Sequence, residues 1–429
     1  MSISKSRTWG PSSARHLIAA NTASFAIMIA LLVMAVRSAQ AQTFTVLYTF
    51  TGLGDGAEPN GLVRDAEGNL FGSAPVGGSF NYGTVFELDT MGKLKVLHNF
   101  AAFDGLMPGS TLIRDAAGDL YGSTLWGGTP EGGACRYGCG TLFQVNQSGK
   151  ESVLYAFTDG GVPFGNMARD ASGNFYGAML DPFPSQWGGV FKVDRSGKET
   201  VLHQFTGKED GGTPYGGVVR DNLGNLYGTT DFGGDLACYG GEGCGTVFKI
   251  DKTGRESVLY AFTGASDGAF PEGALIRDAA GNLYGTTVAG GNESCGAGCG
   301  IVFKLDPAGR ETILHSFTGP PDGKWPDLQT PGAGLVRDAA GNVYGTTQFG
   351  GAAGGCHGDG CGTVFKLDPS GHETVLHSFT GGADGSVPQG LILDAAGNLY
   401  GTTNFGGYSG GDCARYYYAG CGVVFKLTP

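Results

Sequence analysis

The chain has 429 residues and a formal net charge of −12, and 81 of its residues are glycine. The acidic balance argues against nucleic-acid binding, because phosphate contacts need basic patches and no run rich in Lys or Arg is present. So much glycine without a period would indicate disorder, and internal repeats are therefore the first feature to examine.

The first 41 residues have the pattern of a secretory signal. A basic stretch without acids contains Lys5, Arg7 and Arg15, and an apolar run over 26–36 follows it. Ala39-Gln40-Ala41 then offers the small residues of a cleavage site. The alternative is an uncleaved membrane anchor, but polar residues shorten the apolar run below the roughly 20 residues that a span needs. We predict a signal peptide over 1–41, a single mature domain over 42–429 and no membrane span after cleavage.

Three short motifs then recur seven times each along the chain. The motif G-N-L-Y-G begins at Gly68, Gly118, Gly173, Gly224, Gly281, Gly341 and Gly397. The motif G-T-V-F-K-L begins at Gly83, Gly140, Gly188, Gly245, Gly300, Gly362 and Gly422. The motif V-L-H/Y-x-F begins at Val46, Val96, Val153, Val201, Val258, Ile313 and Val375. The first motif returns every 50 to 60 residues.

Each repeat unit contains four short segments with the composition of β-strands. In the first unit these are 62–64, 69–74, 84–88 and 95–100, rich in Val, Leu, Phe, Tyr and Thr and bounded by Gly, Pro and Asp. No segment has a convincing 3.6-residue apolar period. Four strands per unit, repeated seven times, predict an all-β fold, a seven-bladed β-propeller with four antiparallel strands per blade.

Short turns follow the first and third strands of each unit. The segment from Asp278 to Asn282 fits a hairpin with a type I turn, in which Gly281 takes the left-handed conformation and Asp278 accepts hydrogen bonds from the backbone. Gly285 lies inside the next strand and has no side chain. We expect a neighbouring blade to approach it closely.

The two ends of the repeat region complement each other. The last unit stops at its third strand, 424–427, whereas the segment 44–50 is a fourth strand that belongs to no unit. We predict that this N-terminal strand completes the seventh blade and closes the ring.

The repeat resembles the Gloeo/Verruco-type tandem repeat of extracytoplasmic bacterial proteins. The motifs that carry the resemblance are Asn-Leu-Tyr-Gly-Thr-Thr (282–287), Gly-Thr-Val-Phe-Lys-Leu (362–367) and Val-Leu-His-Ser-Phe-Thr-Gly (375–381). It extends from Val46 to Leu427. The resemblance implies a location outside the cytoplasm and a repeat architecture, and it implies no activity.

All ten cysteines lie in the long connection between the second and third strands. They form five local pairs: Cys135/Cys139, Cys238/Cys244, Cys295/Cys299, Cys356/Cys361 and Cys413/Cys421. Units with the shortest loops lack both members of the pair. In an exported chain this pattern predicts five disulfides within loops. A metal site is the alternative, but only one histidine, His357, lies among the pairs, so no metal is predicted.

Aromatic residues crowd the same long loops, on the face of the ring opposite the short turns. Several stand before a Gly-Gly pair, and tyrosines follow them. The candidate ligand-binding residues are Trp126, Tyr137, Phe232, Tyr239, Phe349, Phe405, Tyr408 and Tyr417. Trp187 stands before such a pair in the irregular third unit. Aromatic faces suit sugar rings and protein partners, and the alternative is that these residues fill the gaps between blades.

Charged and titratable residues mostly recur at fixed places in the repeat. Histidine and tyrosine share one position, which indicates a structural role. Arginine recurs before the turn aspartate, and pairing with carboxylates is favoured there over an anion site. Aspartate recurs before glycine in the long loops, at Asp55, Asp104, Asp159, Asp210, Asp267, Asp322 and Asp384. Turn formation is favoured there over calcium binding.

No catalytic residue and no cofactor are predicted. The leading hypothesis is an extracytoplasmic, monomeric, non-enzymatic binding or scaffold module for a glycan or protein ligand. The alternative is an extracellular hydrolase or lyase that acts on polysaccharide. An enzyme would need a carboxylate pair that is unique to one or two blades. Fold alone does not choose between these functions.

Overall fold

The computed structural model describes Met1 and residues 42–128, 135–158, 160–180, 187–326, 334–352, 354–410, 413 and 420–428. The repeats lie in one compact unit, Phe44–Thr428, which is described below. Met1–Thr43 and Pro429 make a second unit, and the predicted signal lies, after Met1, outside the described residues. None of the helices among the described residues has the length and apolar character needed to cross a membrane.

The repeat unit forms seven antiparallel sheets, as the sequence predicts. The first blade contains β2 (Val63–Arg64), β3 (Leu70–Ala74), β4 (Thr84–Leu88) and β5 (Leu94–Asn99). The second contains β6 (Leu106–Pro108), β7 (Ile113–Arg114), β8 (Leu120–Trp126), β9 (Thr141–Val145) and β10 (Glu151–Ala156). The third contains β11 (Val162–Arg169), β12 (Phe175–Leu180), β13 (Gly189–Val193) and β14 (Glu199–Gln204).

The remaining four blades repeat this plan. The fourth contains β15 (Val219–Arg220), β16 (Leu226–Thr230), β17 (Thr246–Ile250) and β18 (Glu256–Ala261). The fifth contains β19 (Ile276–Arg277), β20 (Leu283–Thr287), β21 (Ile301–Leu305) and β22 (Glu311–Ser316). The sixth contains β23 (Lys324–Pro326), β24 (Val336–Arg337), β25 (Val343–Phe349), β26 (Thr363–Leu367) and β27 (Glu373–Ser378). The seventh contains β28 (Ser386–Leu393), β29 (Leu399–Phe405), β30 (Val423–Thr428) and β1 (Thr43–Thr49).

In the second and sixth blades the first strand is divided into two short pieces, so each blade keeps the four-strand plan. In both cases the two pieces pair with the same neighbour, β8 or β25. The only helices in the described part of the chain are three short 3₁₀ turns in long loops, at Tyr239–Gly241, Glu293–Cys295 and Cys356–Gly358. The fold is therefore an all-β, seven-bladed propeller.

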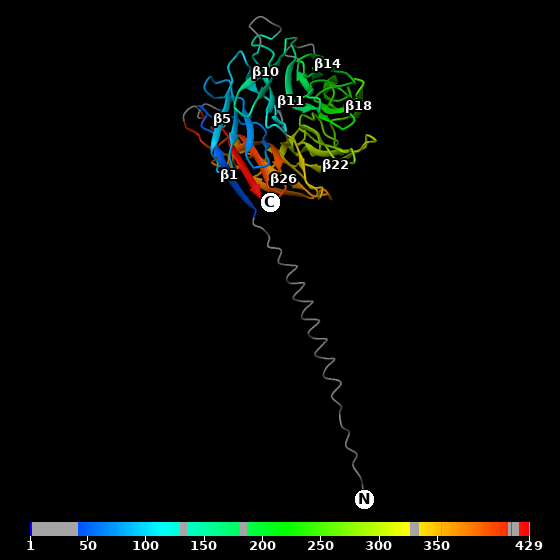
Figure 1. The fold of residues 1–429 in the computed structure, drawn as a ribbon. Helices are drawn as coiled ribbons and strands as arrows, with labels where there is room; N and C mark the ends of the chain where they lie inside the picture. The colour runs from blue at the N-terminus through cyan, green and yellow to red at the C-terminus, as the bar shows by residue number, and fades with distance from the viewer. Residues whose placement is uncertain are drawn as a thin grey trace. The chain divides into compact units, whose positions relative to one another are not determined.

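The seventh blade combines the two ends of the repeat region. Its strand order is β1-β30-β29-β28, so the N-terminal strand lies beside the last strand of the chain. In Figure 1 the blue β1 runs next to the red C-terminal strand. The N–H of Phe50, just after β1, donates to the carbonyl of Gly422 at 3.0 Å.

The turn after the first strand has the predicted geometry. Gly281 has a φ of 90°, and its N–H donates to the carbonyl of Asp278 at 3.0 Å. The Asp278 carboxylate accepts from the backbone and side-chain amides of Asn282 and from the hydroxyl of Tyr284. One aspartate thus fixes the turn and anchors an aromatic ring of the next strand, which explains why these residue types recur at this place in the repeat.

The expected role of Gly285 is wrong, because its close neighbour belongs to the same blade. Gly285 pairs directly with Phe303 on β21. A Cβ atom at Gly285 would lie 2.7 Å from the Phe303 ring and 2.8 Å from the side chain of Leu275. The glycine therefore makes room for a phenylalanine that lies flat across its own sheet.

The blades pack through one repeated aromatic contact. The phenylalanine that follows a fourth strand meets the ring of the third-strand phenylalanine in the next blade. These pairs have centroid distances of 5.0 to 5.4 Å: Phe50–Phe86, Phe100–Phe143, Phe157–Phe191, Phe205–Phe248, Phe262–Phe303, Phe317–Phe365 and Phe379–Phe425. Edge-to-face pairs add to the energy of area burial, so the core is a set of equal contacts between blades.

Candidate functional site on the long-loop face

The long-loop face holds the connections after the second and fourth strands, and one strained backbone position organises it. Six residues that each precede a proline have φ values of 55–60°: Glu58, Met107, Thr213, Phe270, Trp325 and Val387. Their N–H groups donate to the preceding blade, as Phe270 does to the carbonyl of Cys244 at 3.0 Å. Such strain persists only where the surroundings enforce it. Each first strand is thus locked to the loop before it.

All five predicted disulfides are present. They join Cys135 to Cys139, Cys238 to Cys244, Cys295 to Cys299, Cys356 to Cys361 and Cys413 to Cys421. Most of their sulfur atoms belong to buried clusters between blades. The disulfides therefore stiffen the base of the five long loops that carry them.

The structure brings two of the predicted aromatic residues together. The Phe232 ring lies 6.1 Å from Trp187 and 5.9 Å from Phe270, and Phe270 lies 4.9 Å from the ring of Tyr239. Phe232 and Trp187 are largely covered, whereas Tyr239 is 63% exposed. Within this row only Tyr239 offers a free aromatic face.

The other predicted aromatic residues are spread over separate blades. Phe349 packs against Trp325, and the ammonium group of Lys324 lies over both rings. Trp126 and Phe405 are half-buried at the ends of β8 and β29. Tyr137 and Tyr408 are exposed, and Tyr417 lies outside the described residues. The predicted set therefore does not form one site.

A group of exposed apolar residues on the first two blades was not predicted. Phe80 is 60% exposed and Phe103 is 79% exposed. We define the first-blade group as these two residues together with Leu53, Tyr82, Met107 and Tyr137. Of the six, only Tyr137 was predicted. Backbone hydrogen bonds join the loops that carry the group, from Gly78 to Leu53 at 2.8 Å and from Met107 to Tyr82 at 2.9 Å. The signal available in the sequence was an aromatic residue directly before Asp104-Gly105, where other units have small or polar residues.

Two buried acids also depart from the repeat. Asp231 is 5% exposed and Glu272 is 6% exposed, and they come from the fourth and fifth blades. Burial raises the pKa of Asp231 to about 7. Burial and then the charges of Asp231 and Glu272 raise the pKa of Tyr215. Neither acid was singled out from the sequence.

The repeated histidines and tyrosines form bonds between blades. The Nε2 atom of His98 lies 3.2 Å from a carboxylate oxygen of Asp104. A ring nitrogen of His98 and one carboxylate oxygen each of Asp104 and Glu151 lie within 4.8 Å of one another. In another blade a tyrosine makes the same contacts, because the hydroxyl of Tyr260 donates to Asp267 and Glu311. A position that keeps its contacts with either side chain is structural, as the sequence indicates.

The repeated arginines lie over aromatic rings of the preceding blade. The guanidinium carbon of Arg114 is 5.3 Å from the Phe71 ring, and that of Arg277 is 5.6 Å from the Tyr227 ring. Among the residues that the structure describes, only one of these arginines has the expected carboxylate partner within 4.0 Å. It is Arg169, whose guanidinium nitrogen lies 3.6 Å from a carboxylate oxygen of Asp115. Cation–π contacts between blades account for the other members.

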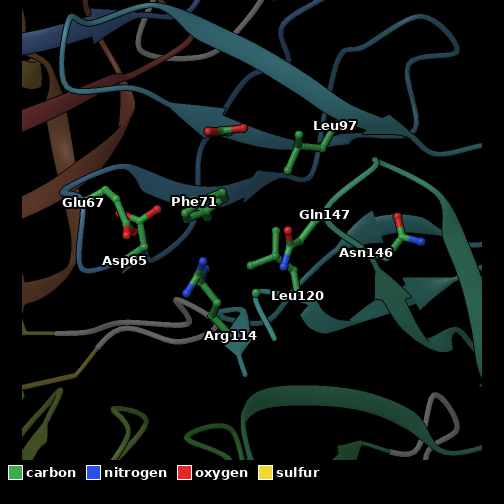
Figure 2. A pocket seen from close by; sticks show the side chains of 10 residues that line it. Asp65, Glu67, Phe71, Leu97, Arg114, Leu120, Asn146 and Gln147 are labelled. Atoms are coloured by element: carbon green, nitrogen blue, oxygen red, sulfur yellow. The ribbon is translucent and has the colours of Figure 1, made fainter. Parts of the chain in front are cut away.

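Two hollows lie on the opposite face, where the turns are short. A cavity of ≈ 340 Å³ between the first and second blades is lined by Asp65, Glu67, Phe71 and Arg114, among others. Figure 2 shows the guanidinium group of Arg114 directed toward Phe71. A second cavity, of ≈ 410 Å³, occupies the equivalent gap between the second and third blades. Both lie at equivalent gaps between neighbouring blades.

Comparison with known families supports the repeat assignment. The model of the Gloeobacter/Verrucomicrobia repeat matches residues 33–239, 129–354 and 297–429. This chain belongs to the Gloeobacter/Verrucomicrobia repeat family. The resemblance seen in the motifs is thereby confirmed. No curated protein matches the chain.

Solved structures share the fold of this Gloeobacter/Verrucomicrobia repeat protein at low identity. The extracellular domain of a putative one-component system from B. thetaiotaomicron has a TM-score of 0.53 and 11% identity, over 85% of this chain and 39% of its own length. A puromycin hydrolase has a TM-score of 0.51 and 14% identity, over 81% of this chain and 50% of its own. An oligogalacturonate lyase in complex with manganese has a TM-score of 0.50 and 13% identity, over 90% and 96%. These similarities concern the fold alone.

Proposed function

We propose that this Gloeobacter/Verrucomicrobia repeat propeller is an exported, non-enzymatic binding module that holds a partner on its long-loop face. The signal-like N-terminal segment supports export. Five disulfides support it too, because disulfides form and persist in oxidising compartments. Locked strands and stiffened loops make a rigid platform, which lowers the ordering cost of binding.

The first-blade group carries this proposal. It places six large apolar side chains on neighbouring loops of one face. The short-turn face exposes two such side chains among the described residues, Met91 and Leu223. Large apolar residues gathered on one exposed surface mark interaction sites, because each loses contact with water when a partner covers it.

The composition of the group favours a protein partner over a glycan. Leu53, Met107 and two phenylalanines have no polar tip, whereas sugar rings need hydrogen bonds beside the aromatic face. Aromatic residues and methionine are enriched at the centres of protein interfaces. We therefore expect the partner to present an apolar surface, and glycan binding is the other outcome of the test.

The test compares two double variants of the oxidised mature protein. Phe80→Ser/Phe103→Ser removes the two most exposed rings of the group, and Met91→Ser/Leu223→Ser is the matched control on the short-turn face. Both are screened by biolayer interferometry against extracellular proteins and soluble polysaccharides. We expect the first variant to weaken binding by about tenfold or more. Weakening by the control alone would show that the other face binds.

A second candidate function has its own observation. Asp231 and Glu272 are buried acids in two neighbouring blades, and such a pair is what an enzyme acting on polysaccharide would need. Product analysis of the same polysaccharide mixtures tests this candidate. Released sugars that disappear in Asp231→Asn would favour the enzyme, whereas binding without turnover favours the module.

A further inference from the structure

The boundary between the fourth and fifth blades carries polar residues that the repeat does not explain. Asp231 directly follows β16, and its counterparts in the other blades are Pro75, Leu125, Leu180, Val288, Gln348 and Asn404. Glu272 follows Pro271, which precedes the first strand of blade five. The same place holds Asn60 in the first blade and Gln389 in the seventh. Another acid, Asp327, stands there in the sixth blade and lies outside the described residues.

These residues converge on one small region. The N–H of Asp231 donates to the carbonyl of Thr213 at 3.0 Å, so Asp231 lies beside the segment of its own blade that leads to Gly216. A Cβ atom at Gly216 would lie 3.1 Å from the Thr229 hydroxyl and 2.6 Å from the carbonyl oxygen of Gly273. Glu272 directly precedes Gly273. The Thr229 hydroxyl therefore faces the start of blade five.

The Thr229 hydroxyl has no hydrogen-bond partner there, although Thr229 is 1% exposed. At equivalent boundaries the matching hydroxyl does bond the next blade. Thr402 donates to the carbonyl of Asn60 at 3.1 Å, and Thr346 donates to that of Gln389 at 3.4 Å. The boundary between blades four and five thus lacks a bond that is present between blades six and seven and between blades seven and one. The hydroxyl of Ser123 in the second blade is also without a partner. The Thr229 oxygen atom lies near the backbone at Gly273, the residue after Glu272.

Asp231 adds a second oxygen atom without a partner. Its Oδ1 atom is buried and accepts no hydrogen bond, and Asp231 forms no ion pair within the described part of the chain. A buried carboxylate without compensation is costly, so it either keeps its proton or meets a cation.

We propose that Asp231, Glu272 and the Thr229 hydroxyl form a binding site for a hard divalent cation of the Ca²⁺ class. Such cations take carboxylate, hydroxyl and carbonyl oxygen atoms and fill their remaining positions with water. One carboxylate comes from each blade, so the bound ion joins blades four and five where the repeated hydroxyl bond is missing. The site lies apart from the first-blade group and does not depend on the proposed function.

Calcium titration tests the site directly. The oxidised mature protein is dialysed against EDTA, and CaCl₂ is titrated into it by isothermal titration calorimetry. We expect binding at a single site, weakened by about tenfold or more in Asp231→Asn. CaCl₂ should also raise the Tm of the wild-type protein and not that of the variant, because a ligand of the folded state stabilises it.

Two further variants keep the result interpretable. Asp104→Asn removes a carboxylate from the His98 and Glu151 cluster and should bind Ca²⁺ as the wild type does. Thr229→Val replaces the hydroxyl ligand by a methyl group of similar shape. It tests the site in place of Asp231→Asn if that variant does not fold. The proposal is overturned if the wild-type protein binds no Ca²⁺, if Asp231→Asn and Thr229→Val bind it unchanged, or if only Asp104→Asn loses it.

Discussion

At the scale of single residues, the repeat is maintained by positions whose neighbours leave no choice of side chain. The second glycine of G-N-L-Y-G shows this, because a phenylalanine of the paired strand lies against it. At Gly285 and Gly401 a Cβ atom would approach the facing ring to 2.7 and 2.5 Å. The sequence marks the position as special, but it does not reveal which ring fills the space.

Gly285→Ala should therefore destabilise the protein. The added methyl group must displace the Phe303 ring in a close-packed core, and overpacking of this kind costs about 1–3 kcal/mol. Urea unfolding of the oxidised protein measures the change. Gly54→Ala is the control, because nothing lies within 4 Å of a Cβ atom there. Equal stability of the two variants would contradict the packing account.

Residues that leave the repeat were harder to interpret from the sequence. The swap between histidine and tyrosine was a sufficient signal, because one shared contact explains both. Phe103 and Asp231 gave a weaker signal, since an aromatic residue stands at the first place, and an acid at the second, in one unit only. Whether such a residue is buried or exposed depends on loop conformation, which has no period. The sequence predicted a binding site on the long-loop face, which stays a hypothesis, and most residues of the first-blade group were not foreseen.

At the scale of elements, the outer strands of neighbouring blades share buried carboxylates. Burial is the main cause that raises the pKa of Glu151, Glu256, Glu311 and Glu373 to about 7. Each of these glutamates begins a fourth strand and lies near the loop aspartate of the preceding blade. The strands could be predicted from composition, whereas these contacts between blades depend on how the sheets stack.

These glutamates should make stability depend on pH. Their folded-state pKa is raised, so the folded chain holds the protons more tightly than the unfolded chain does. Their contribution to the stability of the folded state is fully present below about pH 4.5 and is lost as the pH rises through about 7. The Tm should therefore be lower at about pH 8 than at about pH 5. Aspartates with lowered pKa values, such as Asp384, act below this window.

Glu311→Gln isolates the effect, because its neighbours are Asp267 and Tyr260 and no histidine titrates beside it. The variant should raise the Tm at about pH 8 and leave it nearly unchanged at about pH 5, since glutamine resembles the protonated acid. Glu67→Gln, at an exposed turn, is the control. Parallel pH curves for Glu311→Gln and the wild type would rule out this carboxylate as a source of the dependence.

At the scale of the whole molecule, the prediction of the fold rested on the regular recurrence of the sequence motifs. Seven copies of three motifs predicted the blade number, the strand number and the short turns, because each copy faces the same packing problem. The strand limits differ by about one residue, since hydrogen-bonded pairing and not composition sets the ends. The pairing of β1 with β30 agrees with the expected complement of the two ends, and closure of the ring by this strand stays a prediction.

Deleting residues 43–50 from the mature protein tests that closure. The Phe44 ring stacks on His377 at 3.8 Å, and the Phe50 ring lies 5.2 Å from Phe86 in the first blade. The deletion removes these contacts and exposes the hydrogen-bonding edge of β30, so the first and last blades lose a large part of what joins them. We expect the deletion variant to lose the cooperative thermal transition, as measured by circular dichroism. A chain that begins at Gln42 should keep that transition, because it retains the whole strand.

Phe50→Ala should keep the transition but lower the free energy of unfolding by about 3–5 kcal/mol, since it removes one buried ring and leaves the strand paired. A deletion variant that melts like its parent would show that the ring holds together without its N-terminal strand.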